Sequence, residues 1–319
     1  MYNDNIAYQT LQKHIGRGGM MNYEYYKIFY FVGKHKNISK AATELHSSQP
    51  AVSRVVQTME SELGCKLFVR NKNGVEFTKE GETLFEYVRI AQSQLSKGEE
   101  EVMQAVNVES GTVYVGTTVT ALYGFLYDVL DEFRMQHPGI KIKINTGSSN
   151  GTVEKLKNGI FDIAFVSSPC KIPSQLKARN VGVFSDILIA GNKFAKLKGR
   201  TISLKEVSRY PFVSVRHSMQ LRQFIDEFFA ANDMTVSPDI EADSADLLTP
   251  LIAHNFGIGF VPEDMARAAL QRGEVFKVQT EKEMPQRCIY MVTDPGHPHT
   301  NASRELSRAI SRRLTNKNQ

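Results

Sequence analysis

Apolar residues recur at helical spacing in the first well-patterned part of the chain. From Tyr23 onward, apolar side chains stand at positions 25, 28, 29 and 32, the i, i+3, i+4, i+7 order of an amphipathic helix. Gly33 marks its expected end. Ser39 is then suited to cap a short second helix, whose inner face carries Ala41, Ala42 and Leu45. The pattern predicts two short helices in succession.

A third helix is expected from Gln49-Pro50 to just before Gly64. Proline is tolerated in the first helical turn because the N–H there has no intrahelical partner. Gln49, Ser53 and Gln57 lie at four-residue spacing on the polar side, with Arg54 beside them. The apolar stripe consists of Val52, Val55, Val56, Met59 and Leu63. On periodicity alone, the three helices fit a plain small bundle as well as any specialised module.

A short hairpin and a long helix follow. Residues 67–70 and 75–78 alternate like strands around the turn at 71–74, which predicts a β-wing. From Lys79 to about Val106 the spacing is helical, with Thr78 as the expected N-cap. A helix of this length must bury its apolar stripe, and an antiparallel copy from a second chain would do so. The alternative is that it packs on its own body.

Beyond Ser110 the sequence pattern changes and predicts alternating strands and helices. Strands are expected near residues 112–115, 140–145 and 162–166, separated by helical segments, which predicts a parallel sheet with helical crossovers. The rhythm resumes with strands near 186–190, 212–215, 239–242, 258–261 and 288–293, and ends in a basic helix over 302–314. Two α/β lobes joined by two crossings are expected, the return crossing near Asp294-Pro295-Gly296.

Composition narrows the possible classes of function. The chain has 319 residues, enough for two domains or more, and 41% of them are apolar. No apolar run approaches the roughly 18–20 residues of a membrane span, and residues 1–19 lack a signal-peptide core. We therefore expect a cytoplasmic protein with no membrane partner, whose residues 1–21 form a disordered extension.

Local chemistry argues against an enzyme. The three cysteines lie far apart without a CxxC pair, and His297-Pro298-His299 lacks metal-ligand spacing. No nucleotide-binding glycine motif is present. We expect no catalytic residues, no metal and no cofactor. A redox role for Cys170 is conceivable, but an inert thiol fits better because Lys171 is its one basic neighbour.

Charge is concentrated near the N-terminus. The net charge is +5 overall, while residues 22–79 carry nine basic against five acidic side chains, or +4. A basic excess in a helical module suggests a nucleic-acid partner.

Three stretches carry a resemblance to a known family. Residues 38–54, 60–70 and 77–81, which read ISKAATELHSSQPAVSR, ESELGCKLFVR and FTKEG, closely resemble the helix-turn-helix region of LysR-type transcriptional regulators. The rest of the chain has the layout of that family. The resemblance implies an α+β multidomain fold with a winged helix-turn-helix at 22–78 and a linker and dimerisation helix at 79–109. A two-lobed α/β effector domain, similar to type 2 periplasmic binding proteins, would occupy 110–319. Its first lobe is expected at about 110–168 and 297–315, and its second at about 169–296.

The resemblance also implies which residues meet DNA. Amide and guanidinium groups on the third helix can pair with base edges in the major groove, and hydroxyl and lysine groups can hold phosphates. The expected groove-facing residues are Gln49, Pro50, Ala51, Ser53, Arg54 and Gln57. The expected phosphate and wing contacts are Ser39, Lys40, Ser47, Ser48, Arg70, Lys72 and Asn73.

A second expected site lies between the lobes. Hydroxyl-rich loops follow the first strands of the α/β region, and hydroxyls beside free helix N-termini suit a carboxylate or another small anion. The candidate effector contacts are Thr117, Thr118, Thr120, Ser148, Ser149, Asn150, Ser167, Ser168, Arg216, Ser218, Ser244 and Asp246.

The expected function is therefore a sequence-specific regulator of promoter DNA, controlled by a small anionic effector and assembled as a homodimer or homotetramer. A member of the same family without ligand gating is the alternative. A free-standing solute-binding protein would need export and would leave residues 22–78 unexplained.

Overall fold

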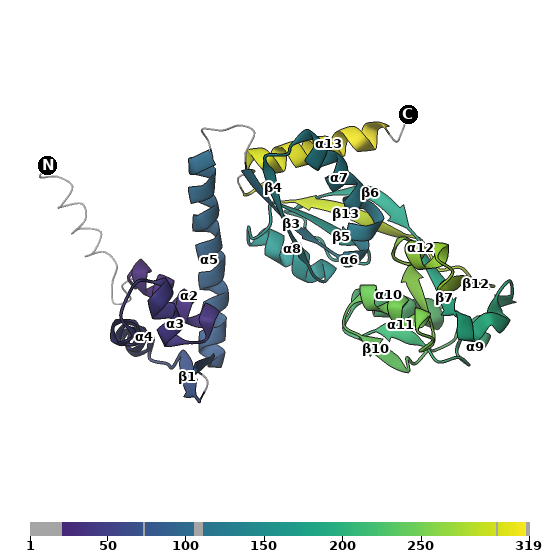
Figure 1. Ribbon diagram of the computed structural model, residues 1–319, viewed down its shortest axis with the longest axis horizontal. Coiled ribbons are helices and arrows are strands. Elements are labelled where there is room, and N and C mark those ends of the chain that lie inside the picture. Colours follow the sequence, from purple (N-terminus) through teal and green to yellow (C-terminus); the bar gives the residue numbers. More distant parts are fainter. Residues whose placement is uncertain (1–20, 73, 105–110, 298, 317–319) are drawn as a thin grey trace, which may run out of the picture. The chain divides into compact units, whose positions relative to one another are not determined.

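The computed structural model describes residues 21–72, 74–104, 111–297 and 299–316. The chain divides into two compact units, with the boundary between Gly98 and Glu99 (Figure 1). No helix in these ranges is both long and apolar enough to span a bilayer.

The first unit is built on three short helices, α2 (Tyr23–His35), α3 (Ile38–Glu44) and α4 (Gln49–Leu63). Ser48 caps α4 by accepting the N–H of Ala51, and Gly64 ends it at φ 70°, a left-handed conformation that glycine adopts without steric cost. The sequence interpretation predicted Ser39 as the N-cap of α3, and this prediction was wrong. Asn37, two residues before Ser39, accepts the N–H of Lys40, because the helix begins at Ile38.

A wing and a long helix complete this unit. Strands β1 (Phe68–Asn71) and β2 (Gly74–Phe77) pair antiparallel, and α5 runs over Lys79–Gln104. Thr78 caps α5 by accepting the N–H of Gly81 at 2.9 Å. The core between helices and wing is aromatic, with the rings of Phe29, Phe68, Phe77 and Phe85 in mutual contact.

The first lobe of the second unit contains a five-stranded sheet in the order β4-β3-β5-β13-β6. The parallel strands are β3 (Gly111–Thr117), β4 (Ile140–Thr146) and β5 (Ile163–Ser167). Strand β13 (Arg287–Thr293) runs antiparallel to β5 and to β6 (Lys177–Phe184). The parallel sheet that the sequence predicts therefore corresponds to strands β3, β4 and β5, whereas β13 and β6 add antiparallel pairs to it.

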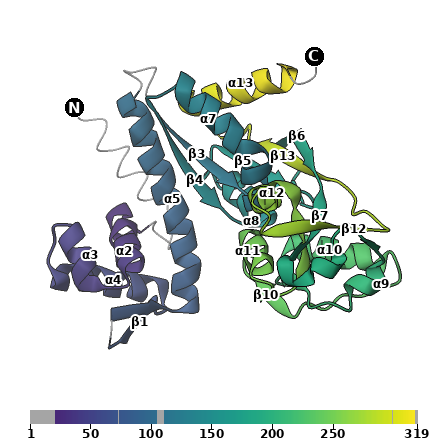
Figure 2. The ribbon, with the colours of Figure 1, turned by 45° about the vertical axis from the view of Figure 1, so that its right-hand side comes forward.

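Helices cover both faces of this sheet. The segments α6 (Val119–Ala121), the π-helical η1 (Leu122–Leu126) and α7 (Tyr127–Gln136) pack with α13 (Asn301–Asn316) against one face. Figure 2 shows α7 and α13 together. Helix α8 (Ser149–Lys157) buries Val153 and Leu156 against the other face.

The second lobe is centred on a sheet of order β11-β7-β12-β8. Its central strand β7 (Asp186–Gly191) pairs antiparallel with both neighbours, and the short parallel pair β9–β10 adjoins β11 through a bridge between Phe212 and Ile258. The remaining strands are β8 (Thr201–Ile202), β9 (Val213–Val215), β10 (Ile240–Ala242), β11 (Ile258–Pro262) and β12 (Val275–Thr280). The helical segments are η2 (Asn192–Leu197), α9 (Leu204–Val207), α10 (Gln220–Ala230), η3 (Ala245–Leu247), α11 (Leu248–Ala253) and α12 (Glu263–Gln271).

The predicted division between the lobes was wrong at both crossings. Strands β6 and β13 both lie in the sheet of the first lobe, whereas the sequence interpretation assigned residues 169–296 to the second. The chain crosses outward at Ser185, between β6 and β7, and returns between Thr280 and Arg287. The physical reason is that antiparallel edge pairing adds β13 and β6 to a sheet whose earlier strands are parallel, and strand order along the chain does not reveal this.

Candidate functional site

Helix α4 presents a free polar face in the first unit. Its apolar residues Val52, Val56 and Met59 are buried against α2 and α3. Gln49, Arg54 and Gln57 on the other side are exposed, and Ser53 is half-buried. The exposed row predicted from the spacing is therefore present, at the start of a capped helix.

The remaining predicted DNA contacts are exposed wherever the structure describes them. Ser39, Lys40, Ser47, Ser48, Pro50, Ala51, Arg70 and Lys72 are exposed, while Asn73 lies outside the described residues. Within the described part of the chain, none of the ion pairs involves Lys40, Arg54, Arg70 or Lys72. These cations are thus available to an external anion such as a phosphate.

The second unit contains a cavity of about 470 Å³ between its lobes. Nine of the twelve predicted effector contacts line it, namely Thr118, Thr120, Ser148, Ser149, Ser167, Ser168, Arg216, Ser218 and Ser244. Three do not. Thr117 is fully buried and donates to the carbonyl of Thr118, Asn150 accepts the N–H of Lys171, and Asp246 lies in η3 outside the wall.

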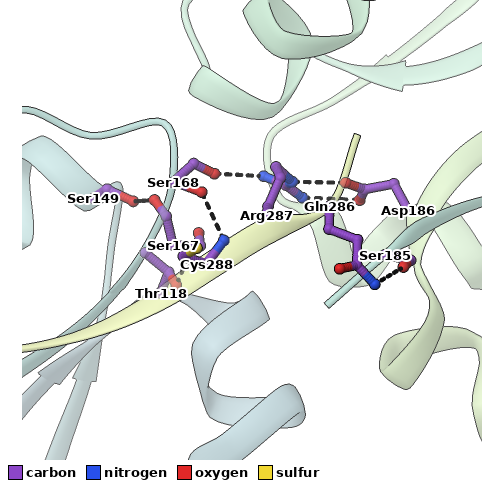
Figure 3. Close-up of polar contacts among 9 residues, drawn as sticks. All are labelled: Thr118, Ser149, Ser167, Ser168, Ser185, Asp186, Gln286, Arg287 and Cys288. Atoms are coloured by element: carbon purple, nitrogen blue, oxygen red, sulfur yellow. Dashed lines mark hydrogen bonds and ion pairs between the residues drawn. The ribbon is translucent and has the colours of Figure 1, made fainter. Parts of the chain in front are cut away.

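Hydroxyl groups form the wall contributed by the first lobe. Ser149 donates to the carbonyl oxygen of Ser167 at 2.8 Å, and the hydroxyls of Thr118 and Ser167 are 3.4 Å apart (Figure 3). Thr118 and Ser148 cap α6 and α8 by accepting the N–H groups of Ala121 and Gly151. Two helix starts therefore face the cavity, as the loops after β3 and β4 predicted.

The lining of the cavity includes a residue that the sequence analysis missed. Arg287, at the start of β13, lines the cavity beside Ser168 and donates to the carbonyl oxygen of Ser168 at 3.1 Å. Its guanidinium group also forms two hydrogen bonds to the carboxylate of Asp186. No local pattern marks Arg287, because an arginine directly before an apolar strand ordinarily reads as a solvated strand end.

The second lobe contributes an exposed ion pair. Nε of Arg216 lies 2.6 Å from Oδ1 of Asp243, and both residues line the cavity. Ser218, Met219 and Gln220, at the start of α10, also line it. Asp243 and Asp186 pair with the two arginines, so the balance of fixed charge here is neutral. Attraction for an anion would come from hydroxyls and helix-start N–H groups more than from net charge.

The described residues form no cluster of metal ligands. The cavity wall includes no histidine, cysteine or glutamate, and no group of three His, Cys, Asp or Glu side chains within the described ranges could hold a metal ion. Burial raises the pKa of the Cys170 thiol, which disfavours the reactive thiolate.

Two family models match the chain. The LysR substrate binding domain matches residues 107–315, and the bacterial regulatory helix-turn-helix protein, lysR family, matches residues 24–82. The sequence is similar to the transcriptional activator CmpR of Synechocystis sp., with 25% identity covering 74% of this chain and 77% of that protein. It is also similar to the transcriptional regulator IlvY of Escherichia coli, with 26% identity covering 74% of this chain and 80% of that protein.

Solved structures show the same fold. The structure of CbnR, a LysR family transcriptional regulator, matches with a TM-score of 0.73 at 18% identity, covering 92% of this chain and 99% of CbnR. Full-length CbnR in complex with its target DNA matches with a TM-score of 0.71 at 19% identity and the same coverage. The expected fold class is confirmed. Since the substrate-binding model alone matches more than half of the residues, the chain belongs to the LysR family of DNA-binding transcriptional regulators, which are not enzymes.

Proposed function

We propose that this regulator reads promoter DNA in a sequence-specific manner through α4. The observation that carries the proposal is the exposed row of Gln49, Arg54 and Gln57 on a helix whose opposite face is buried. Such side chains can form bidentate hydrogen bonds with base edges. In this proposal, Arg70 and Lys72 on the wing hold the phosphate backbone, which fixes the register of α4.

A mobility-shift titration on DNA upstream of the gene tests this proposal. Saturable binding that weakens steeply with salt is expected, with loss of sequence preference in Arg54→Ala. The matched control is Arg209→Ala, which removes the same charge at an exposed position in the second lobe. Equal affinity of the wild type for this DNA and for random DNA at every salt concentration would contradict the proposal for this promoter.

We further propose that a small anion, such as a carboxylate, occupies the interlobe cavity. The hydroxyls of Thr118, Ser149 and Ser167 and the starts of α6 and α8 surround a volume of the size that small ligands fill. An anion there can also compete with Asp243 for Arg216. Occupancy would favour one lobe arrangement, respace the DNA-binding units and change the bend of the promoter.

Assembly through α5 is part of the same proposal. Tyr87, Leu95 and Val102 are exposed on α5, although aromatic and aliphatic side chains ordinarily avoid water. Their spacings of eight and seven residues place them on one side of the helix. An antiparallel α5 from a second chain would cover this stripe, and two such dimers would make a homotetramer that acts in the cytoplasm.

The alternative is a regulator whose DNA binding does not depend on a ligand. Replacing Ser149 by alanine separates the two, because it removes a hydroxyl from the cavity wall. Under the proposal, Ser149→Ala changes regulation of a reporter gene in cells, while Ser208→Ala, at an exposed position of the second lobe, does not. Unchanged regulation in both variants favours the alternative.

A further inference from the structure

Arg287 and Asp186 form the most deeply buried ion pair among the described residues. Their side chains are 3% and 0% exposed. Nε and Nη2 of Arg287 donate to the two carboxylate oxygens of Asp186 at 2.6 and 2.8 Å, and Nη1 donates to the carbonyl of Ser168. A buried charge is tolerated only when paired and hydrogen-bonded in this way.

The position of the pair in the topology is as informative as its burial. Arg287 is the first residue of β13, in the sheet of the first lobe, and Asp186 is the first residue of β7, in the sheet of the second. Each therefore stands at one of the two crossings between the lobes. Figure 3 shows the pair together with the neighbouring contact between Gln286 and Ser185, at 3.5 Å. The two crossing segments are thus tied to each other by side chains.

Two aromatic rings hold the guanidinium group in place. Its central carbon lies 4.5 Å from the ring centre of Phe184 at the end of β6 and 5.2 Å from that of Phe224 in α10. One ring belongs to each lobe, and α10 begins at the cavity wall. A rotation of one lobe against the other must therefore change at least one contact of Arg287.

We propose that the Arg287–Asp186 pair is a pin that sets the angle between the lobes, with Arg287 as the positioning residue that transmits cavity occupancy to both crossings. Arg287 and Ser168 line the cavity and also bond to each other. A ligand that binds beside Ser168 therefore lies next to the guanidinium group of Arg287. The part of this inference in which Arg287 couples ligand binding to the lobe angle rests on the proposed function. The part in which the ion pair sets the lobe angle does not, because it requires no ligand.

The variants must avoid leaving one buried charge alone, since that would unfold the lobe junction. Arg287→Lys keeps the charge opposite Asp186 but loses the planar fork that bonds both Asp186 oxygens and Ser168. The double variant Arg287→Met/Asp186→Asn removes both charges and keeps side chains of similar size. Arg222→Lys is the matched control, since buried Arg222 makes a similar fork to Asp226 and Glu241 entirely within the second lobe.

The measurement is the distance between the lobes. Spin labels carried by unnatural amino acids at exposed Lys157 in α8 and exposed Lys205 in α9 leave the three native cysteines in place. Pulsed dipolar spectroscopy is done on the full-length, ligand-free chain mixed with an excess of unlabelled chain, so that only spin pairs within one chain contribute. It is expected to give one narrow distance peak for the wild type and for Arg222→Lys. Arg287→Lys and the double variant should lose that single peak. A wild-type distribution in Arg287→Lys would overturn the pin.

A second arm uses sodium sulfate as the anion probe, against sodium chloride at equal ionic strength. Sulfate is expected to shift the wild-type peak and to leave the distribution of Arg287→Lys unchanged. The same shift in both proteins overturns the transmission through Arg287. No shift in the wild type overturns the transmission together with the anion cavity, whereas the pin is still decided by the ligand-free comparison.

Discussion

The carboxylate of Glu60, on the C-terminal part of α4, accepts the backbone N–H of Leu67 at 2.9 Å. It also accepts hydrogen bonds from the backbone N–H of Phe68 at 3.2 Å and from Nζ of Lys66 at 2.6 Å. Glu60 is buried, with a relative exposure of 8%. The contact joins α4, the helix proposed to read DNA, to the first strand of the wing, so the two elements are held in one geometry.

This contact predicts a pH dependence of the first unit. Burial alone raises the pKa of Glu60, but the bonds from Lys66 and the two backbone N–H groups outweigh burial and lower it below the usual 4.5. A lowered folded-state pKa means that the stabilisation is complete above 4.5 and is lost as the pH falls through the folded value. Hydrogen exchange of peptides covering residues 67–77, at neutral pH and below 4.5, measures this loss.

The variant Glu60→Gln should show little of that pH dependence. It keeps the shape of the side chain but removes the charge, and we expect it to destabilise the wing by about 1–3 kcal/mol at neutral pH. Glu62→Gln, at an exposed position of the same helix, is the control and should exchange like the wild type. Identical protection in all three proteins would contradict the role assigned to Glu60.

Two glycines of α5 should respond in opposite directions to alanine. A Cβ at Gly81 would lie 1.9 Å from the carbonyl oxygen of Leu67, whereas a Cβ at Gly98 would meet nothing within 4 Å. Gly81→Ala must push α5 away from the wing and destabilise the first unit. Gly98→Ala should instead stabilise the helix by about 1 kcal/mol through helix propensity alone. Thermal unfolding of both variants shows whether each raises or lowers the stability. An unchanged stability of Gly81→Ala would show that the wing can shift freely.

Arg54 and Lys72 should differ in how their loss changes DNA binding. Arg54→Ala is expected to cost about 1–3 kcal/mol and to relax specificity at the bases it reads. Lys72→Ala should weaken binding to all sequences alike and reduce the salt slope by about one. Titrations on the preferred site and on random DNA, each across a salt series, distinguish the two. A uniform loss in both variants would assign Arg54 to the phosphate backbone.

The exposed stripe of α5 should govern assembly. Each buried leucine contributes about 1.5–3 kcal/mol, so Leu95→Glu is expected to weaken a dimer formed through α5 by tenfold or more. Val69→Glu places the same charge on an exposed strand of the wing and serves as the control. Sedimentation velocity over a concentration series measures both. Unchanged association of Leu95→Glu would place the interface elsewhere.

Helix α4 shows how far local signals reach. Pro50 in the first turn, the apolar stripe and Gly64 at the end all act within a few residues, and they predict the observed limits Gln49–Leu63. The same holds for the wing and for the helix caps Thr118 and Ser148, whose turn and cap chemistry is local. The cap of α3 shows the limit of this reasoning, because Asn37 and Ser39 are both acceptable N-caps and packing selects the start.

Strands β6 and β12 and helix α12 were not predicted. The first half of β6, from Lys177 to Asn180, is exposed at a sheet edge, so its sequence lacks the apolar alternation that identifies a strand. Its backbone pairing with β13 decides its structure instead. A pattern of side chains cannot report a partner that lies more than a hundred residues away in the chain.

By itself, the sequence determined the helix-turn-helix with its wing, the long α5, the alternating α/β region and most of the hydroxyl groups of the cavity. These features depend on periodicity, caps and turns, whose physical range is a few residues. The tertiary structure alone decided which strands share a sheet, where the chain crosses between lobes, and that Arg287 meets Asp186, 101 residues away. Those outcomes depend on backbone pairing and on the burial of charge, which exist only once distant segments come together.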